Sequence, residues 1–133
     1  MTCFWDGILR SLQSHQLIES SMKIHPFIET LQKAAHDKNH IESVLWNQEP
    51  LSSQLQQELL QHIREFDTST VSQGYLCSSC EAFLCLLCDM LQVRIEHTYC
   101  NHRILYEPKD IESSKHNHIL LRFKSDKGHF WKV

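Results

Sequence analysis

The feature that most constrains the fold is an apolar run of seven residues, Ala82–Cys88 (AFLCLLC). A helix formed by this stretch is apolar almost all round, so it needs cover on most of its sides. A membrane span requires about 20 such residues, so the run indicates a buried helix and no membrane contact. Ser78 and Glu81 have the spacing of a capping box. We therefore expect a central, buried helix over residues 79–91.

Length and composition favour one domain covering residues 1–133. The chain is 41% hydrophobic and is long enough to bury a sizeable core. Its 3 glycines and 3 prolines argue against a turn-rich, all-β fold. The formal net charge of −3 is unlike the strongly basic composition of nucleic-acid-binding proteins, so we expect no nucleic-acid partner.

Apolar residues at helical spacing predict two further helices, at residues 4–14 and 26–35. A third helix of about 13 residues is expected after a capping box formed by Ser53 and Gln56.

The pattern changes in the last third of the chain. Alternating apolar residues predict strands near 93–98, 104–106, 119–123 and 129–133, with the tetrapeptide SDKG as a hairpin turn before the last strand. A polar loop is expected at 67–75. We therefore expect an α+β domain, in which helices from the first two-thirds pack on a small, mainly antiparallel sheet from the C-terminal third.

Six cysteines occur, at positions 3, 77, 80, 85, 88 and 100. No basic segment precedes an apolar stretch at the N-terminus, so no secretory signal is expected. The thiols should then be reduced in an intracellular compartment, the cytoplasm, or the host cytoplasm for a pathogen effector.

Four of these cysteines form a CxxC-x4-CxxC pattern, which is typical of zinc sites. On one helix, however, Cys85 and Cys88 lie about 140° and 80° around from Cys80, so their thiolates cannot converge on one ion. We expect buried core cysteines and no metal, with a small zinc protein as an alternative.

Cys3 and His129 stand apart from the other candidate residues. Cys3 precedes an amphipathic helix, whose dipole favours a thiolate at its N-terminus. His129 follows a turn at the start of the last predicted strand. A thiol at a helix start and an imidazole at a strand start are the usual layout of a Cys–His protease dyad.

The sequence Thr2-Cys3-Phe4-Trp5-Asp6-Gly7 resembles the end of the nucleophile motif of the OTU (ovarian tumour) cysteine proteases. That motif runs Asp-Gly-Asn-Cys-Phe, followed by an aromatic, a polar and a small residue. Likewise, Gly128-His129-Phe130 is similar to the Gly-His-Tyr or Gly-His-Phe around the histidine of that family. Gly74-Tyr75, followed by the central helix and the first strand, resembles the segment between the two motifs.

The resemblance implies an OTU-like, papain-type fold and a deubiquitinase that needs no cofactor. Cys3 would attack the carbonyl after the C-terminus of ubiquitin, polyubiquitin or a ubiquitin-like modifier, with His129 as general base. Thr2 replaces the usual Asn, and the preceding Asp-Gly segment is expected to be missing. Trp131 stands where the family often has Asp or Asn, so no third residue is assigned, although Asp126 is close in sequence. A weak or inactive ubiquitin-binding module of the same fold is the alternative.

Overall fold

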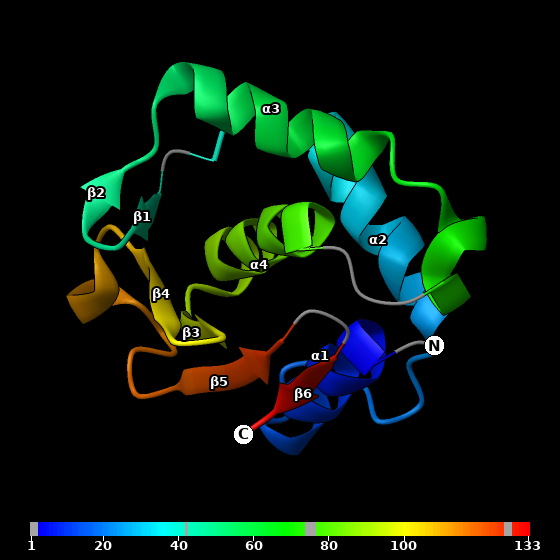
Figure 1. Ribbon diagram of the computed structural model, residues 1–133. Coiled ribbons are helices and arrows are strands. Elements are labelled where there is room, and N and C mark those ends of the chain that lie inside the picture. Colours follow the sequence, from blue (N-terminus) through cyan, green and yellow to red (C-terminus); the bar gives the residue numbers. More distant parts are fainter. Residues whose placement is uncertain (1–2, 42, 74–76, 127–128) are drawn as a thin grey trace.

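The computed structural model describes residues 3–41, 43–73, 77–126 and 129–133 (Figure 1). These residues form an α+β arrangement of four α-helices, two 3₁₀ helices and six strands. None of the described helices combines the length and the apolar character that crossing a membrane requires. In chain order the elements are α1 (Cys3–Ser14), α2 (Ile24–Asp37), β1 (Val44–Trp46), β2 (Glu49–Pro50), α3 (Ser53–Arg64), η1 (Thr68–Gln73), α4 (Cys77–Leu91), β3 (Arg94–Tyr99), β4 (His102–Pro108), η2 (Ile111–Ser113), β5 (Leu120–Ser125) and β6 (Phe130–Lys132).

Helix α4 is the centre of the molecule. It lies between α3 and the strands, and it also contacts α2 (Figure 1). Every side chain from Ala82 to Cys88 is at most 2% exposed, which confirms the predicted buried helix. The helix begins at Cys77, so Ser78 lies inside its first turn. The predicted capping box, which needs Ser78 before the helix, is therefore wrong.

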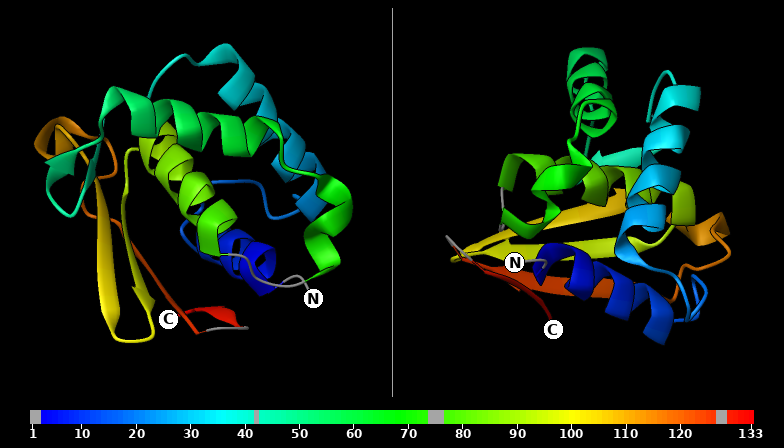
Figure 2. Two further views of the ribbon diagram at one scale, coloured as in Figure 1. Left: turned by 45° about the horizontal axis from the view of Figure 1, so that its top comes forward. Right: turned by 90° about the vertical axis from the view of Figure 1, so that its right-hand side faces the viewer.

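The sheet has the strand order β2-β1-β4-β3-β5-β6. The four strands expected in the C-terminal third are present, and every adjacent pair is antiparallel except β3 and β5. The four α-helices lie on one side of the sheet (Figure 2), where α4 and α1 pack on the strands and α2 and α3 pack on other helices. On β5, Leu121, Phe123 and Ser125 are buried on this covered face, while Arg122 and Lys124 are exposed.

The sheet is mainly antiparallel, as predicted, but its extent corrects the prediction and its one parallel pair adds to it. Residues 44–50 add the strands β1 and β2, so the sheet is not built from the C-terminal third alone. β1 joins because its backbone pairs with the free edge of β4, a pairing that depends on main-chain groups rather than on a side-chain pattern. The connection of residues 109–119 then carries the chain from β4 past β3 to its other side, so that β5 pairs in parallel with β3.

The start of α3 also differs from the prediction by one residue. Ser52 is the N-cap, and its Oγ accepts a hydrogen bond of 3.1 Å from the Leu55 N–H. Gln56 is not part of a cap but is buried, where its Oε1 accepts from the Ile41 N–H and its Nε2 donates to the Leu51 carbonyl. Only Ser53 has a glutamine three residues later, but either serine can act as an N-cap, so the burial of Gln56 leaves this role to Ser52. The expected loop at 67–75 contains the 3₁₀ helix η1, and residues 74–75 lie outside the description.

The β1–β2 hairpin turns through two residues, Asn47 and Gln48, which have positive φ values of 49° and 71°. Asn47 is well suited to this turn, because its N–H donates to the Leu105 carbonyl and its Oδ1 accepts from the Leu105 N–H, both at 2.8 Å. Gln48 is exposed and carries a side chain that disfavours this backbone region.

Replacing Gln48 with glycine should raise the free energy of unfolding by about 0.5–1 kcal/mol, because Asn-Gly is the preferred pair for a two-residue hairpin turn. Urea unfolding measures the change. Lys33→Gly, at an exposed position within α2, is the control and should lower the same free energy by about 1 kcal/mol. Equal decreases in the free energy of unfolding for both variants would contradict the turn geometry.

Candidate active site

Trp5 fixes the start of α1 on the helical layer. Its ring is 4% exposed, and its centroid lies 4.7 Å from that of Phe83 on α4. Phe27 on α2 and Phe66 after α3 complete the cluster, at 6.2 and 6.0 Å from Trp5. Aromatic edge-to-face contacts of this kind stabilise a core beyond simple area burial. The first turn of α1 is therefore held by three other parts of the helical layer.

The opposite side of the same turn packs on β6 (Figure 1). The ring centroids of Phe4 and Phe130 are 4.7 Å apart, and both side chains are buried. One turn further along α1, Gly7 faces the same strand. A methyl group at Gly7 would lie 3.5 Å from the Phe130 ring and 3.6 Å from the Lys132 backbone nitrogen. Glycine has a low helix propensity, and here it lies where β6 approaches α1 closely.

The β5–β6 turn places His129 directly before β6. Ser125 and Phe130 are partners in the strand register, and the Asp126 N–H donates to the His129 carbonyl at 2.9 Å. His129 is exposed. Cys3 is the first residue of α1. Since Phe4 follows Cys3 and Phe130 follows His129, the Phe4–Phe130 contact places the backbone at the start of α1 near the start of β6.

The other residues of the predicted motifs lie outside the described part of the chain or are exposed. Thr2, Gly128 and the side chain of Cys3 lie outside the described part of the chain. Asp126 is exposed at the end of β5, where its backbone holds the turn. Trp131 pairs with Lys124 on β6 and is 41% exposed.

A buried polar pair lies beneath this turn, and no sequence motif indicates it. His97 on β3 and Ser125 on β5 are 0% and 3% exposed, and the His97 Nε2 lies 2.6 Å from the Ser125 Oγ. Burial lowers the pKa of His97 from 6.5 to about 4, so the imidazole is neutral at pH 7. The strand alternation already placed His97 on the same face as Val93 and Ile95, which was the available signal.

The clustered cysteines on α4 belong to the core. Cys80, Cys85 and Cys88 are buried, as expected for core residues. Burial raises the pKa of the Cys85 and Cys88 thiols well above their ordinary value, and neighbouring negative groups add to the effect. A thiol held in its protonated form is a poor nucleophile and a poor metal ligand. The side chain of Cys77 lies outside the description.

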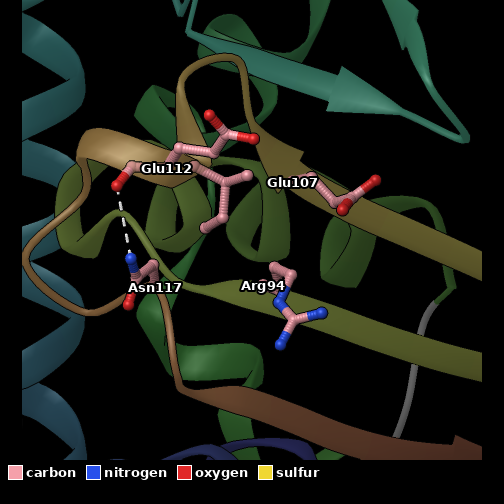
Figure 3. Close-up of a pocket in the computed structure, with 5 residues that line it drawn as sticks. Arg94, Glu107, Glu112 and Asn117 are labelled. Atoms are coloured by element: carbon pink, nitrogen blue, oxygen red, sulfur yellow. Dashed lines mark hydrogen bonds between the residues drawn. The ribbon is translucent and has the colours of Figure 1, made fainter.

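A separate pocket of about 290 Å³ lies near the beginning of β3 (Figure 3). Arg94 and Glu107 from neighbouring strands line it, together with Ile111, Glu112 and Asn117 from the following connection. The candidate active site lies at the other end of β3, because Tyr99 pairs with Ser125 beside the β5–β6 turn. The pocket therefore contributes no group to the candidate active site.

Comparison with protein-family models, curated proteins and solved structures gives no match. The arguments for function therefore come from the residues and their geometry.

The packing of α1 on β6 can be tested at Gly7. We expect Gly7→Ala to raise the free energy of unfolding by up to about 1 kcal/mol, because alanine favours the helix and its methyl group would make ordinary contacts. Gly7→Leu should lower it by about 1–3 kcal/mol, since the larger side chain overlaps the Phe130 ring. Denaturant unfolding gives both values. Similar values for the two variants would contradict the packing.

Burial of His97 predicts a specific dependence of stability on pH. The unfolded chain takes up the proton near pH 6.5 and the folded protein only near pH 4, so stability is fully present above pH 6.5 and is lost as the pH falls toward 4. The loss from this residue should reach about 3 kcal/mol. His97→Gln cannot titrate, so its unfolding free energy should fall less than that of the wild type between pH 6.5 and 4. Parallel curves of unfolding free energy against pH for the two proteins would show that burial does not lower the pKa of His97.

Proposed function

We propose that the chain is a thiol-dependent hydrolase that cleaves the peptide or isopeptide bond after the C-terminus of ubiquitin or a ubiquitin-like modifier. Cys3 is the nucleophile and His129 the general base. The observation that carries the proposal is the 4.7 Å contact between Phe4 and Phe130, which are the neighbours of these two residues. An OTU-like, papain-type arrangement of the helices and the mixed sheet forms part of the proposal.

The reaction follows from the chemistry of the two side chains. His129 accepts the Cys3 proton, and the thiolate attacks the carbonyl carbon to give a tetrahedral adduct. The C–N bond then breaks, the amine leaves with the proton from His129, and a thioester remains. Water, deprotonated by His129, hydrolyses the thioester and releases the carboxylate together with the free thiol. The cycle uses no cofactor.

The start of α1 supplies the electrostatic support that this chemistry needs. The first N–H groups of a helix have no partner within the helix, and the positive end of the helix dipole favours an adjacent anion. Cys3 is the first residue of α1 in the described part of the chain, and the proposed reaction would use these donors to stabilise the thiolate and the developing oxyanion. The Asp126–His129 backbone hydrogen bond holds the base at the turn.

One observation favours the second candidate function, a ubiquitin-binding module with little or no hydrolysis. Trp131 follows His129 by two residues, and an indole donates a hydrogen bond but accepts none. It therefore cannot orient the imidazole as a carboxylate or carboxamide would. An enzyme without such a group would rely on the turn alone to hold His129.

Labelling with ubiquitin that carries a C-terminal electrophile separates the two functions. We expect one covalent adduct per chain, located at Cys3 by mass spectrometry, because thiolate formation is favoured at the helix start. Cys3→Ser should abolish the adduct, and His129→Ala should lower its rate by about 10²–10⁴-fold. Cys100→Ser, which removes an exposed thiol, is the matched control and should label like the wild type.

Each other outcome has a definite meaning. An adduct at Cys100 or Cys77 instead of Cys3 would refute the assignment of the nucleophile. Saturable ubiquitin binding without an adduct would favour the binding module. Absence of both binding and labelling would exclude both candidate functions.

A further inference from the structure

The His97–Ser125 pair is a polar contact inside an otherwise apolar region. The imidazole packs against the Phe130 ring, with a centroid distance of 5.4 Å, and its strand neighbours Ile95 and Ile104 are apolar. Two apolar side chains could fill the same space without the cost of burying polar groups. A buried polar pair is directional, however, so it can fix the relative position of the elements that carry it.

Ser125 is fixed through three separate contacts. Its Oγ meets the His97 Nε2 at 2.6 Å, and its carbonyl accepts a hydrogen bond of 3.0 Å from the Cys100 N–H. It is also the register partner of Phe130 on β6. Ser125 is the last residue of β5, so these contacts determine where the turn to His129 begins.

His97 also contacts the second half of the candidate active site. Phe130, on which the imidazole packs, touches Phe4 at the start of α1. The imidazole therefore supports both the strand that follows His129 and, through the two phenylalanine rings, the helix turn that begins with Cys3. No other buried histidine is found among the residues that the structure describes.

We propose that His97 and Ser125 are positioning residues, which hold the β5–β6 turn and the start of α1 so that His129 faces Cys3. The inference rests on the proposed Cys–His function and adds to it the residues that orient the base. In this arrangement a hydrogen bond across two parallel strands replaces a third residue next to the histidine. Neither side chain needs to touch the substrate.

The test measures the pH profile of Cys3 alkylation by iodoacetamide in the full chain, with Cys100 as the exposed reference thiol in the same molecule. Mass spectrometry gives both rates separately. In the wild type, the pH midpoint of the alkylation rate at Cys3 should lie below the midpoint at Cys100, because a well-placed imidazole favours the thiolate. Ser125→Ala should move the Cys3 midpoint up by about one pH unit and lower the rate at pH 6 by about tenfold.

Two amide variants form a matched pair. His97→Gln is long enough to reach the Ser125 Oγ, and it should keep the Cys3 rate within about threefold of the wild type. His97→Asn has the same amide but is one carbon shorter, so it should behave like Ser125→Ala. Should Ser125→Ala not fold, this pair gives the same information. Ile63→Val, a buried change in α3, controls for general loss of stability and should leave the Cys3 profile unchanged.

The remaining outcomes distinguish this inference from the proposed function. A lowered Cys3 midpoint that Ser125→Ala and His97→Asn leave unchanged would overturn the positioning role alone. An equal shift in Ile63→Val would also overturn it, because the effect would then follow stability. A wild-type Cys3 profile like that of Cys100 would overturn the positioning role, and ubiquitin labelling at Cys3 would then decide whether the hydrolase proposal survives.

Discussion

The burial of the middle of α4, from Ala82 to Cys88, is the constraint on which the rest of the structure depends. A helix that is apolar on every side is stable in water only if other elements surround it. The sheet covers one side, α3 covers another, and α2 contacts it as well. Phe83, from the middle of α4, also packs against Trp5, so the same helix anchors the start of α1. The position of the candidate active site is thus set by packing around α4.

A short chain of aromatic contacts extends this packing to both ends of the sequence. Trp5 ties α1 to the helical layer, and Phe4 joins it to Phe130 on the last strand. Close packing transmits position, because a core side chain has few alternative places. A functional pair built from Cys3 and His129 would therefore rest on two rigid elements, while His129 itself stays exposed at a turn.

Burial also makes Cys85 and Cys88 on α4 less reactive than an exposed thiol. Cys85 and Cys88 lie in an apolar environment that raises the pKa of each thiol, so they contribute to the core as small apolar residues. Two of the buried polar side chains have partners that fix geometry: Gln56 bridges two loop segments, and His97 meets Ser125. The Gln56–Ile41 and His97–Ser125 contacts join residues that are 15 and 28 positions apart in the sequence.

Local patterns in the sequence were enough to predict the central helix, the alternation that buries His97, and a helix start at Cys3 followed much later by a turn before His129. These signals depend on neighbouring residues only, and helix and strand periods are local properties. The addition of β1 to the edge of β4, the parallel pairing of β3 with β5, and the choice of Ser52 over Ser53 as a cap were decided by tertiary structure. Main-chain pairing at a sheet edge is open to almost any sequence, and two adjacent serines cap equally well until packing selects one. The Phe4–Phe130 contact likewise required the whole fold, since it joins opposite ends of the chain.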